Sequence, residues 1–191
     1  MRIYFDEPGG VLSAAELHAA ALDGDLVPIG LGWAPADAVE TPAVRAAALR
    51  PALGDALAAV CLTAAWVHGA LDDPPARLHA QRATPFGGRR PSTHAMHVRD
   101  ALLPAPDQEL RGGVRVSTAA RTLVDLVAET IARPDRPSPS APGTIRRAVG
   151  ALAREADVGA AALRLAATRP RIPHRAELVR RLQEEVTRYT S

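Results

Sequence analysis

The alternation of apolar and polar positions in the first 40 residues predicts one helix followed by a short hairpin. The helix is expected over 11–22, because Ser13 can cap it and Glu16 stands three residues further on, as in a capping box. Short strands over 26–29 and 33–35 flank a glycine turn. A helix followed by such a hairpin is the outline of a small winged-helix unit, or of an irregular lid on the main domain.

The pattern changes at residue 41, where helical and strand-like stretches alternate. Thr41-Pro42 is a cap followed by a first-turn proline, and it predicts a helix to Leu49 that Pro51 ends. The same rules predict further helices over 62–69 and 118–131, half-buried strands over 77–83 and 94–99, and a hairpin over 108–116.

The last third of the chain has helical spacing throughout, after a proline-rich stretch over 133–143 that predicts a surface loop. The expected fold is therefore α+β. A small, degenerate winged-helix-like unit over 1–40 precedes a mixed α/β domain over 41–191, whose C-terminal third is helical.

Composition excludes several classes of enzyme. The 23 basic residues are all arginine, so the chain can supply no phosphate-loop lysine, no Schiff base and no lysine-dependent nuclease signature. The formal net charge of +2 neither demands nor forbids a nucleic-acid partner.

Cysteine usage and the first residues indicate a cytoplasmic protein. Cys61 is the single cysteine, so no intrachain disulfide can form, and its apolar surroundings predict a buried, inert thiol. Acidic residues and a Pro-Gly-Gly turn stand where a signal peptide needs an apolar stretch. No Gly-x-Ser-x-Gly motif is present, so nucleophilic hydrolysis is unsupported.

Histidines raise the question of a metal site. His79 lies on one expected strand, and His94 and His97 lie on the next. Positions three apart on a strand point to opposite faces, so we interpret the three as partly exposed strand residues and expect no metal and no cofactor. His68 is expected at the C-terminal end of a helix, where an imidazolium interacts well with the helix dipole.

Three arginine pairs are candidates for contact with an acidic partner, because guanidinium groups bind phosphates through paired hydrogen bonds. They are Arg89-Arg90, Arg146-Arg147 and Arg180-Arg181. Glu177 stands four residues before Arg181, and Glu184 four before Arg188, so the last pair can equally belong to a salt-bridged, solvent-facing surface. Arg89-Arg90 has no acidic neighbour and lies in a glycine-rich loop.

Several blocks, in order, resemble the AbiEi-family antitoxins of type IV (abortive infection) toxin–antitoxin pairs. They are GVLSxxEL at 10–17, GWAP at 32–35, TPxxRAAAL at 41–49, LTAAWxHG at 62–69, RLH at 77–79 and VSTAARTLxDL at 116–126. Within these blocks Arg121 and Asp125 lie four apart on one helix, with Leu123 and Leu126 facing the core and Trp66 filling volume, as in a structural scaffold.

The resemblance implies a winged helix-turn-helix that binds its own promoter, and a domain that counteracts a nucleotidyltransferase-type toxin. Family members usually carry an extra arginine-rich helix before the hairpin, which is missing here. The expected DNA-binding residues are Ser13, His18, Arg89 and Arg90. The expected partner-binding residues are Arg146, Arg147, Arg180 and Arg181.

The expected function is that of an antitoxin-like transcriptional regulator that acts by binding and is not an enzyme. Two alternatives remain at this point. One is the remnant of a DNA-processing, nuclease-related enzyme, and the other is an orphan protein-interaction module.

Overall fold

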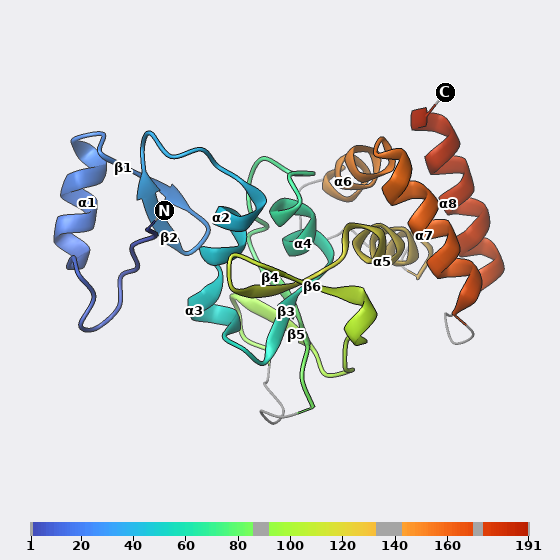
Figure 1. Ribbon diagram of the computed structural model, residues 1–191, viewed down its shortest axis with the longest axis horizontal. Coiled ribbons are helices and arrows are strands. Elements are labelled where there is room, and N and C mark those ends of the chain that lie inside the picture. Colours follow the sequence, from blue (N-terminus) through green and yellow to red (C-terminus); the bar gives the residue numbers. More distant parts are fainter. Residues whose placement is uncertain (1, 86–91, 133–142, 170–173, 191) are drawn as a thin grey trace.

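The protein is described from a computed structural model that covers residues 2–85, 92–132, 143–169 and 174–190. Three parts follow one another along its longest axis (Figure 1). The N-terminal unit lies at one end, a five-stranded sheet with short helices lies in the middle, and four longer helices lie at the other end. Almost all of the predicted proline-rich loop, residues 133–142, lies outside the described residues.

The N-terminal unit has the predicted helix and hairpin. Helix α1 (Ala14–Leu22) begins at Ser13, whose hydroxyl accepts from the Glu16 amide while the Glu16 side chain bonds back to Ser13, which completes the predicted capping box. Strands β1 (Leu26–Ile29) and β2 (Gly32–Pro35) pair antiparallel. Tyr4 extends this pairing through a bridge to Trp33.

The tip of the hairpin packs against the middle of the molecule. A side chain at Gly30 would lie 3.1 Å from the Trp66 ring and 3.2 Å from the Ala48 Cβ, so only glycine fits this turn without displacing them. Ile29 and Ala34 belong to the same buried core as the sheet residues. The division at residue 40 stays a prediction.

The central sheet has the strand order β5-β4-β3-β7-β6. The strands are β3 (Leu57–Ala59), β4 (Leu78–Arg82), β5 (Met96–Arg99), β6 (Gln108–Arg111) and β7 (Val114–Ser117). Strand β3 pairs antiparallel with β4 and parallel with β7, β4 pairs parallel with β5, and β6 and β7 form the predicted antiparallel hairpin.

The central strand, β3, was not predicted from the sequence. All three of its residues are buried, so it shows no alternation, and it continues into the apolar residues of α4 (Cys61–Val67). The expectation that Pro51 ends a helix is also only half right. Helix α2 (Pro42–Ala47) ends before it, but Pro51 then stands in the first turn of α3 (Arg50–Leu53), a position that proline favours.

The helical C-terminal third and the α+β class are confirmed. Helices α5 (Ala119–Ala132), α6 (Thr144–Ala153), α7 (Ala156–Thr168) and α8 (Arg175–Thr190) pack on one another, with α5 in contact with the other three. Leu178 and Leu182 of α8 are fully buried. Val186 and Tyr189 pack against Gly159 and Gly150, whose missing side chains let α8 come close. None of the described helices is both long and apolar enough to span a membrane.

The β6–β7 turn provides a stability test. Gly112 has φ +54°, and a Cβ there would lie 2.0 Å from the Ala43 carbonyl oxygen, whereas Gly113, with φ +79°, has nothing within 4 Å. We expect Gly113→Ala to cost about 1 kcal/mol for its left-handed backbone. Gly112→Ala should cost on the order of 3 kcal/mol, because α2 must also move. Urea unfolding of both variants measures the difference, and equal losses would contradict the contact.

Candidate partner-binding surface

A hollow of about 490 Å³ lies between α5, α6 and α8 and brings three arginines together. Arg146 comes from α6, and Arg181 and Arg188 come from α8. Val127 and Val149 supply apolar wall, and Thr130 and Glu185 add polar groups. Two of the predicted partner-binding residues, Arg146 and Arg181, therefore share one surface although they are distant in the sequence.

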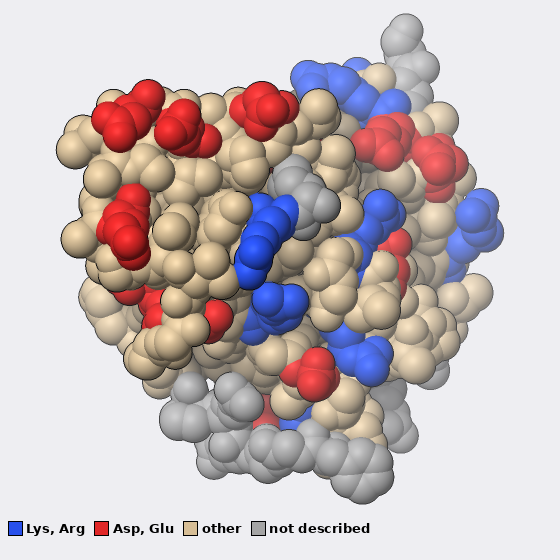
Figure 2. All heavy atoms as spheres, turned by 60° about the vertical axis from the view of Figure 1, so that its left-hand side comes forward, with Lys and Arg blue, Asp and Glu red and all other residues tan. Residues whose placement is uncertain are grey.

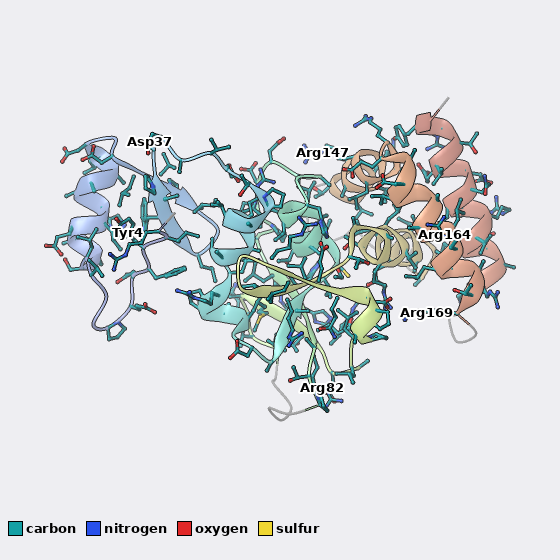
Figure 3. All side chains as sticks on the ribbon, in the orientation of Figure 1. Tyr4, Asp37, Arg82, Arg147, Arg164 and Arg169 are labelled. Carbon is teal, nitrogen blue, oxygen red and sulfur yellow. The ribbon has the colours of Figure 1, made fainter. Side chains whose placement is uncertain are left out.

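Arg146 and Arg147 are the exposed pair without a carboxylate partner among the described residues. They lie in the first turns of α6, and Arg147 is labelled there in Figure 3. Their neighbours Ala148 and Val149 are buried, so the helix is anchored through one face while both guanidinium groups extend into solvent. Such groups have donors available for phosphate or carboxylate.

Arg180 and Arg181, by contrast, are engaged on their own helix. Arg180 Nε lies 3.0 Å from a Glu177 carboxylate oxygen, Arg181 Nε lies 3.1 Å from the other, and Arg180 also pairs with Glu184. These hydrogen bonds lower the pKa of Glu177 and raise that of Arg180. The predicted salt bridge from Glu184 to Arg188 is wrong, because Arg188 pairs with Glu185 at 3.0 Å.

A buried ion network joins this helical part to the sheet. Asp107 ends the short 3-10 helix η1 (Ala105–Asp107), is 1% exposed, and receives Arg121 of α5 at 2.6 Å. Arg169, which is labelled in Figure 3, follows α7 and pairs with the other Asp107 oxygen. Arg121 Nε also donates to Asp125 Oδ1 at 3.0 Å, as expected for two residues four apart on one helix.

The roles of Asp107 and Arg169 in this network were not predicted from the sequence. They lie 62 positions apart, and no local pattern links them. The second Asp125 oxygen is buried without a hydrogen-bond partner, 4.0 Å from Arg99 Nη1. Burial raises the pKa of Asp125, an effect that Arg121 and Arg99 oppose. We assign the network a structural role, in agreement with the expected scaffold of Arg121, Asp125, Leu123, Leu126 and Trp66, the last three of which are fully buried.

The histidines do not form a metal centre in the described part of the chain, where no group of three or more His, Cys, Asp or Glu is placed to hold an ion. His79 and His97 stand opposite each other on β4 and β5, with ring centroids 6.3 Å apart. Burial lowers the pKa of His79 to about 4, so its ring is neutral at pH 7. His94 is exposed and precedes β5 instead of belonging to it, contrary to expectation.

His68 caps the C-terminal end of α4, as predicted, but its burial disfavours the expected imidazolium. Burial lowers its pKa, which outweighs the opposite effects of its 2.8 Å hydrogen bond to the Ser117 carbonyl and of Glu109. Cys61 is buried, as predicted, and burial raises the pKa of its thiol to about 12, which leaves almost no thiolate for chemistry.

The two predicted DNA-binding residues of the N-terminal unit already have internal contacts. The Ser13 hydroxyl takes part in the capping box, and the His18 Nδ1 lies 2.7 Å from the Ala14 carbonyl while its ring packs edge-on against Trp33. Arg89 and Arg90 lie outside the described residues.

The N-terminal unit carries a strongly negative charge. Residues 1–40 hold Arg2 and seven acidic residues, which leaves 22 of the 23 arginines and 14 of the 21 acidic residues in 41–191. Figure 2 brings this unit forward and shows acidic side chains along its upper and left edges. A surface of this sign repels a phosphate backbone.

The chain thus combines a core of apolar residues and ion pairs with arginines on its surface, and its one cysteine is a buried, protonated thiol. A comparison with protein-family models matches residues 58–171 to the AbiEi antitoxin C-terminal domain. The chain belongs to the AbiEi antitoxin family, since this match spans more than half of it. Among curated proteins, no sequence matches the chain.

The network around Asp107 gives the second test. Asp107→Asn leaves two arginines facing a neutral side chain in a buried place, and we expect a loss of about 3 kcal/mol in unfolding free energy. Glu184→Gln is the matched surface control, because exposed ion pairs contribute less than about 1 kcal/mol. Thermal and urea unfolding measure both variants. A D107N protein as stable as E184Q would show that the network does not join the two parts.

Proposed function

We propose that the chain acts as the antitoxin that counteracts a nucleotidyltransferase-type toxin, by binding and not by catalysis. Family membership supports the antitoxin role. The observation on which the binding surface rests is the pair Arg146 and Arg147, exposed and without carboxylate partners among the described residues, beside a hollow of about 490 Å³.

The proposed partner contact combines charge with shape. Arg146, Arg181 and Arg188 surround the hollow, while Val127 and Val149 give it apolar wall. An acidic group of a partner that enters between the arginines gains paired hydrogen bonds, and its apolar part can cover the valines. Arg180 contributes less, because Glu177 and Glu184 already hold it. Arg181 and Arg188 also have carboxylate partners, so Arg146 is the arginine of the hollow that has none among the described residues.

The two other classes of function have less support. A nuclease-related enzyme needs carboxylates grouped around a metal ion, and the described residues hold no such group. An orphan interaction module would share the same surface, so only the neutralisation assay described next separates it from an antitoxin.

Neutralisation can be tested by growth. We expect the wild-type chain, co-expressed with a nucleotidyltransferase-type toxin, to restore growth of cells that the toxin arrests. Arg146→Ala combined with Arg147→Ala should lower the rescue at least tenfold in colony count, whereas Arg180→Ala should leave it unchanged. Equal protein levels and unfolding midpoints are the control for folding. Full rescue by the double variant would refute the proposed surface.

We also propose that the chain binds DNA, and that arginines of residues 41–191 make the contact in preference to α1. The arginine surplus of that region supports this proposal, as does the acidity of the N-terminal unit. Of the four residues expected to touch DNA, Arg89 and Arg90 have the side chains suited to phosphate, while Ser13 caps its helix.

A gel shift with the upstream promoter, repeated across salt concentrations, tests DNA binding. Arg89→Ala combined with Arg90→Ala should weaken binding and reduce the salt slope by about 2, one unit for each phosphate that the variant can no longer bind. His18→Ala, a substitution on an exposed face of α1, should have little effect. The absence of any shift at low salt would remove the DNA-binding proposal, and a shift abolished only in H18A would transfer the contact to α1.

A further inference from the structure

A second cavity, of about 590 Å³, lies at the other end of the molecule from the arginine hollow. One wall is the N-terminal segment, residues 2–12, and the other is formed by α2 and Arg50, with Gly112 of the β6–β7 turn beside them. No function discussed so far uses this cavity, and it involves none of the residues of the 490 Å³ hollow.

An arginine projects from each wall of the cavity, and each is held by an aromatic ring. The guanidinium carbon of Arg2 lies 5.7 Å from the centre of the Tyr4 ring, and that of Arg50 lies 5.7 Å from the centre of the Phe5 ring. Tyr4 lies beside the hairpin, with α1 beyond it (Figure 3). A guanidinium over a ring is oriented by it, while its in-plane N–H donors stay available for an acceptor.

Neither arginine forms an ion pair with a residue in the described ranges, although this end of the molecule is rich in acids. Arg2 is the single Lys or Arg residue of the first 40, and it lines this cavity together with Glu7, one of the seven acidic residues of the unit. Both guanidinium groups are exposed and line the same cavity, so both can donate hydrogen bonds to one anionic ligand. Their shared cavity is therefore suited to a ligand with at least two negative charges.

The other residues that line the cavity indicate that the ligand also has an apolar part. Val44, Ala47 and Leu12 present apolar surface to the cavity, and Tyr4 presents a half-exposed ring. A volume of about 590 Å³ is within the range of pockets for small organic ligands and larger than phosphate alone requires. A flat, largely apolar ring system with a phosphate group matches both halves of the cavity.

We propose that this cavity binds a free nucleotide, with Arg2 and Arg50 on the phosphates and the base against the apolar wall between Tyr4 and α2. Glu7 also lines the cavity and carries the opposite charge. It weakens the affinity for phosphate and so keeps binding dependent on both arginines. The ligand would join the N-terminal segment to α2, and its binding would stabilise that contact.

Equilibrium binding of ADP to the full chain, measured by calorimetry, tests the proposal. We expect one molecule of ADP per chain, with adenosine at least tenfold weaker because it lacks the phosphates. Arg2→Ala, a substitution in an exposed terminal segment, and Arg50→Ala should each weaken ADP binding at least tenfold. Glu7→Gln should strengthen it severalfold, and the R146A/R147A variant, with its arginines at the other end, should bind as the wild type does.

Further ligands decide between the possible sources of the phosphate. Pyrophosphate should bind more weakly than ADP, since the base contributes. A 5′-phosphorylated tetranucleotide that binds at least tenfold more tightly than ADP would assign the cavity to the end of a nucleic-acid strand and overturn the free-nucleotide proposal. No ADP binding at 1 mM, or binding that R2A leaves unchanged while the variant keeps the wild-type unfolding midpoint, would overturn it as well. Neither result bears on neutralisation, which uses the opposite end of the molecule.

Discussion

The buried carboxylate of Asp107 connects the parts of this protein. It is 1% exposed and receives Arg121 of α5 and Arg169 from the end of α7, so an ion from the edge of the sheet holds two helices of the C-terminal third. A buried carboxylate is costly unless it is paired, and here two guanidinium groups provide the pairing. This contact adds to the apolar packing of α4 against α5 and α6, which also joins the helices to the sheet.

Because the chain contains no lysine, arginine side chains make several different kinds of contact. Arg121 and Arg169 are half-buried partners of carboxylates, whereas glutamates on α8 hold Arg180 and Arg181. Arg146 and Arg147 extend from α6 into solvent. A count of arginines therefore says little about binding. What distinguishes the third group is the lack of a carboxylate within reach among the described residues, and this depends on the fold.

Charge is divided unequally along the chain, between an acidic N-terminal unit and an arginine-rich remainder. The acidic N-terminal unit is poorly suited to a phosphate backbone, whereas residues 41–191 hold 22 of the 23 arginines. Each of the two candidate binding sites is lined by arginines. One is the arginine hollow of the helical end, and the other is the cavity that contains the one arginine of the N-terminal unit.

The sequence by itself determined most helices and strands, the α+β class and the family, because caps, glycine turns and apolar periodicity act over a few residues. It could not reveal β3, whose buried residues have no alternation, or the pairing of Asp107 with Arg169 across 62 positions. Only the tertiary structure decided which arginines have carboxylate partners, that burial lowers the pKa of His68 and of His79, and that Arg2 and Arg50 line one cavity. These properties depend on burial and on contacts between distant segments, which local patterns do not encode.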